Sequence, residues 1–179
     1  MKYLVRDKLL GFGEDYRIED ENGRYAYLVD GKALSLRDTT ELKDPDGRIL
    51  LVLRSRLLSV RETMVLERED RRLAVIRRKR LSLLRGHVLV SLVDGTELDV
   101  SGRIADREFR VDLDGEPLAL VSRQWYRVRD TYAVDVLRED ADPALLLAVV
   151  VCAIRMADKE REDREDEAGR TAPREEAPL

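Results

Sequence analysis

The sequence predicts a mainly β fold, a closed antiparallel barrel of about twelve strands around an apolar helix near the C-terminus. Three observations predict it: closely spaced turn motifs, short segments rich in β-branched residues between them, and one apolar run of eleven residues, 144–154. A chain of 179 residues lies in the usual size range of one domain. We therefore expect a single barrel domain over residues 1–157.

The turn motifs are Asn-Gly and Asp-Gly pairs, which tolerate the positive φ angles that tight hairpin turns require. They occur at positions 22–23, 30–31, 46–47, 94–95 and 114–115. The segments between them are rich in Val, Ile, Leu and Tyr, as is typical of strands. We interpret the following segments as strands: 24–29, 49–53, 72–76, 87–93 and 131–137.

Three of these turns belong to an internal repeat. The turns at 22–23, 46–47 and 114–115 are each followed, at the same separation, by a short motif that ends in Thr39, Thr63 or Thr131. A recurring unit of turn, strand, turn and strand indicates a meander of similar hairpins. The irregular spacing of the copies argues against a solenoid or a propeller.

The apolar run near the C-terminus predicts a helix over about 143–156. Asp142 is a preferred N-cap residue and Pro143 suits the first helical position. The helix is apolar on every side, so it must be enclosed all round, and a barrel can enclose it. The run is too short for a bilayer, which needs about twenty apolar residues.

The net charge of −4 comes entirely from residues 158–179, where nine acidic residues face five basic ones. We expect this segment to be a disordered acidic tail, although its first ten residues are able to extend the helix through charge pairs one turn apart. The rest of the chain is electrically balanced. A nucleic-acid partner is therefore not expected.

Single residues exclude several kinds of site. Cys152 is the only cysteine, which excludes an intramolecular disulfide and suits a reducing compartment. The N-terminus becomes charged before an apolar signal segment can form, so we expect a cytoplasmic protein. His87 is the only histidine, and we assign it no role. We expect no metal, no cofactor and no catalytic residues.

A resemblance to a known family rests on the segment 54–66 (RSRLLSVRETMVL), preceded by 34–38 (LSLRD) and the turn at 44–47 (DPDG). Over residues 3–157 the chain resembles LURP-one-related proteins. The resemblance implies the fold of the Tubby C-terminal domain and of phospholipid scramblases, a twelve-stranded closed barrel threaded by a hydrophobic helix. Relatives in that fold bind or act on lipids, but such similarity does not transfer function.

One cluster of charged residues differs from the rest of the chain before residue 158, which is electrically balanced. Between residues 68 and 85 there are eight basic residues against two acidic ones. Arg77, Arg78, Lys79 and Arg80 form the candidate site for an anionic lipid headgroup, because arginine binds phosphate with two parallel hydrogen bonds. The alternative is an exposed edge whose charges pair with the tail or prevent aggregation. Trp125 and Tyr126 lie among arginines, an arrangement that suits stacking on bases or a position at a lipid interface, but aromatic residues of strands more often belong to the core.

These observations favour a non-enzymatic protein that binds anionic phospholipid headgroups, located in the cytoplasm or attached peripherally to a membrane. A second hypothesis is an intracellular interaction or scaffold module that has a protein partner and no small ligand. A third is an enzyme whose site the sequence does not reveal. The oligomeric state and the identity of the ligand stay open.

Overall fold

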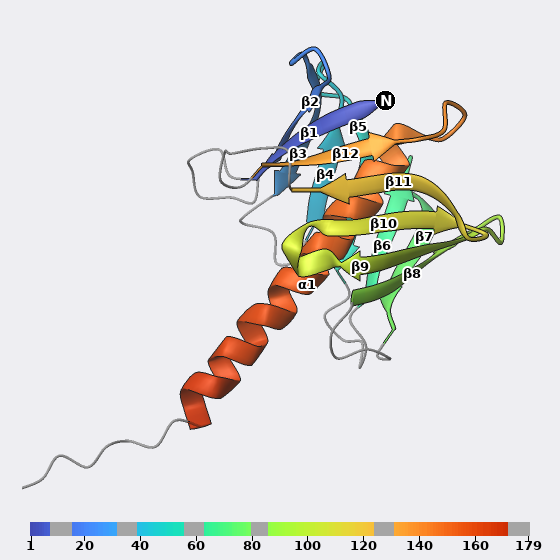
Figure 1. The fold of residues 1–179 in the computed structure, drawn as a ribbon. Helices are drawn as coiled ribbons and strands as arrows, with labels where there is room; N and C mark the ends of the chain where they lie inside the picture. The colour runs from blue at the N-terminus through green and yellow to red at the C-terminus, as the bar shows by residue number, and fades with distance from the viewer. Residues whose placement is uncertain (8–15, 32–38, 56–62, 80–85, 124–130, 172–179) are drawn as a thin grey trace, which may run out of the picture.

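The computed structural model describes residues 1–7, 16–31, 39–55, 63–79, 86–123 and 131–171 (Figure 1). These residues form twelve strands, one short 3-10 helix and one long α-helix. The strands are β1 (Lys2–Asp7), β2 (Tyr16–Asp20), β3 (Tyr25–Gly31), β4 (Thr39–Lys43), β5 (Ile49–Ser55), β6 (Thr63–Arg68), β7 (Arg71–Arg78), β8 (Gly86–Leu92), β9 (Glu97–Arg103), β10 (Glu108–Leu113), β11 (Glu116–Ser122) and β12 (Thr131–Val136). The helices are η1 (Ile104–Asp106) and α1 (Pro143–Thr171).

The strands form one closed antiparallel barrel in which each strand pairs with its neighbours in the sequence. The barrel closes at β1, which pairs with β2 on one side and with β12 on the other. Val5 of β1 lies opposite Ile18 and Tyr132 in the two ladders. This arrangement confirms the predicted fold class and the predicted meander.

The internal repeat corresponds to successive hairpins of the barrel. Its three turns precede β3, β5 and β11, and Thr39, Thr63 and Thr131 are the first residues of β4, β6 and β12. The segments 32–38, 56–62 and 124–130, which join these strands, lie outside the described residues. Each copy of the repeat therefore places one tight turn at one end of the barrel and one strand start at the other.

The core consists of the inward side chains of the strands packed around α1. Strand residues that point inward, such as Leu53, Ile76 and Val100, are completely buried. On the helix, every residue from 146 to 154 is at most 2% exposed. Burying large apolar side chains contributes about 1.5–3 kcal/mol each, so the enclosed helix supplies a major share of the folding free energy.

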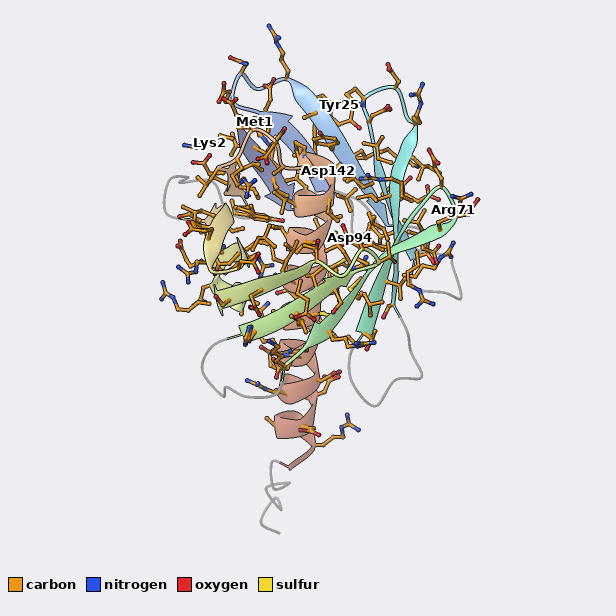
Figure 2. All side chains as sticks on the ribbon, turned by 90° about the vertical axis from the view of Figure 1, so that its right-hand side faces the viewer. Met1, Lys2, Tyr25, Arg71, Asp94 and Asp142 are labelled. Atoms are coloured by element: carbon orange, nitrogen blue, oxygen red, sulfur yellow. The ribbon has the colours of Figure 1, made fainter. Side chains whose placement is uncertain are left out.

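The helix begins where the sequence predicts. Asp142 caps it, because its Oδ1 accepts a hydrogen bond from the backbone N–H of Leu145 at 3.1 Å. Figure 2 shows Asp142 at one end of the barrel, while α1 emerges from the other end.

The helix extends well beyond its expected end at about residue 156 and runs to Thr171. Ion pairs one turn apart support this extension, as Arg164 and Glu160 lie 2.5 Å apart and Arg161 and Glu165 lie 3.9 Å apart. Much of the segment expected to be a disordered tail is therefore helical. Residues 172–179 lie outside the described part, and the domain boundary at residue 157 stays a prediction.

Candidate functional site

The predicted basic cluster at the end of β7 does not gather on one surface. Successive side chains of a strand point to opposite faces, and Ile76 points into the core. Arg77 is exposed on the outer wall. Arg78 is half-buried and belongs to the alternate residues of β7 that point inward, as Ile76 does. Arg80 lies outside the described residues. The pleat therefore separates the two neighbouring arginines.

Lys79 belongs to a small charged group on the outer wall. Its Nζ lies 3.3 Å from Oδ1 of Asp99, and Nε2 of His87 lies 2.7 Å from the same oxygen. The hydrogen bond with His87, together with that from Lys79, holds the pKa of the Asp99 carboxyl below its usual value. Lys79 is thus engaged with a carboxylate on the wall of the barrel.

Arg78 points into the end of the barrel from which α1 emerges. Its guanidinium forms an ion pair with Oε2 of Glu160 on α1. The other carboxylate oxygen of Glu160 accepts a hydrogen bond from Arg164, at 2.5 Å. One helix carboxylate therefore lies between two guanidinium groups, one from a strand and one from the helix.

A cavity of about 260 Å³ opens at this position between the barrel end and α1. Four arginines line it, and they come from β7, β9 and α1. They are Arg78, Arg103, Arg161 and Arg164. Apolar side chains of the core, among them Val88 and Met156, form part of its lining.

Among the described residues, the lining carries an excess of positive charge, because Asp106 and Glu160 are the acidic residues that face the four arginines. The ion pairs at the rim of the cavity have long distances and lie between exposed side chains. Arg103 lies 4.0 Å from Asp106, and Arg161 lies 3.9 Å from Glu165. Exposed pairs of this kind contribute little, so these guanidinium groups are able to exchange a carboxylate for another anion.

The short helix η1 and the residue after it fix the position of α1. Arg107 has a left-handed backbone conformation, with φ of 59°. Its guanidinium donates hydrogen bonds to both carboxylate oxygens of Asp158 on α1, at 2.9 and 2.7 Å. This two-point contact holds the helix against η1, so the arginines of the helix lie at the same end as Arg78.

Gly86, the first residue of β8, allows the close approach of Ile104. A Cβ added at Gly86 would lie 2.8 Å from Cδ1 of Ile104, which is closer than real side chains come. Because glycine stands here, η1 packs directly over the strand. The wall of the cavity next to Arg103 depends on this contact.

The chemistry of the cavity suits an oxyanion. Guanidinium groups engage phosphate oxygens through paired hydrogen bonds, which are stronger than neutral ones. No group of three or more His, Cys, Asp and Glu residues within the described ranges is arranged to hold a metal ion. Within the same ranges, no helix is both long and apolar enough to cross a membrane.

The sequence identified only one of the four lining arginines, Arg78. Arg103 stands at the end of a strand, and Arg161 and Arg164 fall in the first ten residues of the acidic segment, for which the sequence allowed an extension of the helix but indicated no site. Their spacing of three residues would place them on one helix face, which is the one signal in the sequence that they act together. Trp125 and Tyr126 lie outside the described residues.

Comparison with known proteins identifies relatives by family and by fold. A family model described as LURP-one-related matches residues 1–154. No curated protein matches the chain. The X-ray structure of a protein from Arabidopsis thaliana is similar, with a TM-score of 0.61 and 16% sequence identity, and the match covers 88% of this chain and 91% of that chain. At this identity the likeness concerns the fold alone.

Proposed function

The chain belongs to the LURP-one-related family, and we propose that it is a non-enzymatic protein that binds the headgroup of an anionic phospholipid in the cavity beside α1. The observation that carries the proposal is the convergence of four arginines from three elements on one cavity with an excess of positive charge. In this proposal the protein is cytoplasmic and associates with membranes peripherally.

The size of the cavity supports a small anionic group as the ligand. Pockets for drug-sized molecules measure about 300–1,000 Å³, whereas this cavity measures about 260 Å³. It therefore suits a phosphate and its immediate substituents better than a large cofactor. Its lining arginines offer more donors than the carboxylates of Asp106 and Glu160 can occupy.

The proposal replaces the sequence-based candidate site only in part. Arg78 remains in the site, and Arg77 and Lys79 lie close to it on the outer wall, where they add positive potential near a membrane surface. Such attraction is screened by salt over about 10 Å at 0.1 M ionic strength. Binding to vesicles should accordingly weaken as the salt concentration rises.

Co-sedimentation with liposomes tests the proposal. Vesicles of phosphatidylcholine alone are compared with vesicles that also contain phosphatidylserine or a phosphoinositide. The test variant carries Arg78→Ala, Arg103→Ala and Arg164→Ala. The control variant carries Arg48→Ala, Arg71→Ala and Arg72→Ala, three exposed arginines beside the tight turns at the opposite end of the barrel.

We expect the wild-type protein and the control variant to sediment with the anionic vesicles, and the test variant to stay in the supernatant. An equal loss of vesicle binding in both variants would show that the cavity is not the site, because both variants remove the same amount of charge. Absence of binding by the wild-type protein would overturn the proposal and favour an interaction module with a protein partner.

A further inference from the structure

A second hollow lies on the outer wall of the barrel, next to the arginine-lined cavity. It is an open groove of about 750 Å³ across β8, β9, β10 and β11. Cross-strand neighbours form one outward row of its lining, in which His87 lies opposite Ser101, Ser101 opposite Arg110, and Arg110 opposite Leu120. The groove is thus built from the ends of four paired strands, at the same end of the barrel as the cavity.

The groove and the cavity meet at the edge of the barrel. Both are lined by Gly86 and Arg103. Gly86 has no side chain to separate them, and Ile104 covers it only on the side of the cavity. A ligand held at Arg103 therefore lies next to both hollows, and its uncharged part is able to extend along the outer wall into the groove.

Two charged side chains of the groove, Arg110 and Glu108, have partners within or beside it. Nε of Arg110 lies 2.8 Å from Oδ2 of Asp112. Glu108 accepts a hydrogen bond from the Ser122 hydroxyl at 3.2 Å and another from the backbone N–H of Arg123 at 3.0 Å. The ion pair neutralises Arg110, whereas the two neutral donors stabilise the Glu108 carboxylate without cancelling its charge.

The groove also presents apolar surface. Leu120 is 42% exposed and is one of the few large apolar side chains on the surface of the described residues. The aliphatic stems of Arg103 and Arg110 are able to cover apolar atoms while their charged ends remain in water. The floor includes the small residue Ser101, which leaves room for a chain to lie close to the sheet.

We propose that this groove holds the hydrocarbon chain of the same amphiphile whose phosphate group occupies the arginine-lined cavity. The inference rests on the proposed function, and it extends that proposal by assigning a binding site to the hydrocarbon chain of the ligand. Charge complementarity selects the occupant, because the cationic cavity takes the phosphate, and the groove, in which Glu108 and Arg110 carry opposite charges, takes the uncharged part next to it. The protein then binds a single amphiphile and not only a charged membrane surface.

A series of monomeric alkyl phosphates tests this inference directly. Inorganic phosphate is compared with butyl, hexyl and octyl phosphate, each below its micelle concentration, and affinity is measured from amide chemical shifts in NMR spectra. A fully buried methylene raises affinity about fourfold and a half-buried one about twofold. We expect affinity to rise steadily with chain length in the wild-type protein.

Two leucine variants separate the groove from general surface effects. Leu120→Ser should flatten the dependence on chain length and leave the affinity for inorganic phosphate unchanged. Leu137→Ser is the matched control, because Leu137 is 44% exposed and does not line the groove. The Leu137→Ser variant should retain the wild-type dependence of affinity on alkyl chain length.

The outcomes distinguish this inference from the proposed function. If phosphate and all alkyl phosphates bind with equal affinity, or if both leucine variants behave alike, the groove does not hold the chain although the cavity binds phosphate. If none of the compounds binds, the proposed function fails and the inference fails with it.

Discussion

Glu160 is the residue on which the proposed site depends most. Its carboxylate lies between the guanidinium groups of Arg78 and Arg164, where a phosphate group would lie. The ligand must therefore compete with a carboxylate that the protein itself supplies. This internal competition keeps the two arginines in place and lowers the affinity for weakly charged anions.

Replacing Glu160 should strengthen anion binding. We expect Glu160→Gln to raise the affinity for inorganic phosphate by about tenfold, because removing one competing charge is comparable to gaining one charge-assisted hydrogen bond. Glu162→Gln makes the same charge change at an exposed position of α1 and should have a much smaller effect. An unchanged or weaker affinity in Glu160→Gln would show that the anion does not bind between these arginines.

Cys152 reports at the residue scale on the enclosure of the helix. It is completely buried, and burial raises the pKa of its thiol to about 12. The thiolate is the reactive form, so the folded protein should react very slowly with a thiol reagent at pH 8 and fully once it is unfolded. Below its usual pKa the buried, protonated thiol stabilises the folded state. This contribution to the free energy of unfolding is lost as the pH rises from that usual value through the raised pKa of about 12. Rapid labelling of the folded protein would contradict the enclosed helix.

At the scale of elements, the central packing relation is that between α1 and the barrel. Val150 is completely buried in the apolar segment of the helix. Val150→Asp places an ionised carboxylate in this core, at a cost that exceeds the usual total stability of a domain. We expect the variant to be insoluble or to lack a cooperative thermal transition.

The matched control for that substitution is Lys159→Asp, which introduces the same side chain at an exposed position of the same helix. It should melt cooperatively, close to the wild-type temperature. A soluble and cooperatively melting Val150→Asp protein would mean that the helix is not enclosed.

The sequence predicted the elements well where the signal is local. Four of the five Asn-Gly and Asp-Gly pairs mark tight turns with a positive φ angle at glycine, as at Gly23 and Gly115, whereas the prediction of a turn at Asp30-Gly31 is wrong, because these residues end β3. Asp142 and Pro143 mark the start of α1. The end of α1 was placed too early, because residues after Met156 have no apolar face and are held in the helix by ion pairs such as that of Arg164 with Glu160.

The candidate site was harder to predict because it combines distant segments. The run from Arg77 to Arg80 stands out in the sequence, yet the strand pleat sends Arg77 and Arg78 to opposite faces. Arg103 joins Arg78 only because β7, β8 and β9 are neighbours in the closed sheet. Pairing between strands and the length of α1 therefore decide the site, and neither follows from local composition.

At the scale of the whole molecule, the two ends of the barrel carry different features. One end carries the tight turns and the capped start of α1, and the other carries the cavity beside the emerging helix (Figure 1). The barrel and its helix form the stable body, since both are held by the apolar core. Arg78 and Arg103 are placed by strands of that body, and Arg161 and Arg164 by the part of α1 that extends beyond it.

The most direct test of the account is an NMR titration of the wild-type protein with inorganic phosphate, read at each backbone amide. We expect saturable shifts concentrated at Gly86, Ile104 and Glu160, which line the cavity. Amides of the tight turns at the opposite end of the barrel should remain unchanged. Shifts spread evenly over the surface, or no saturable shift at all, would contradict an anion-binding cavity at the end of the barrel.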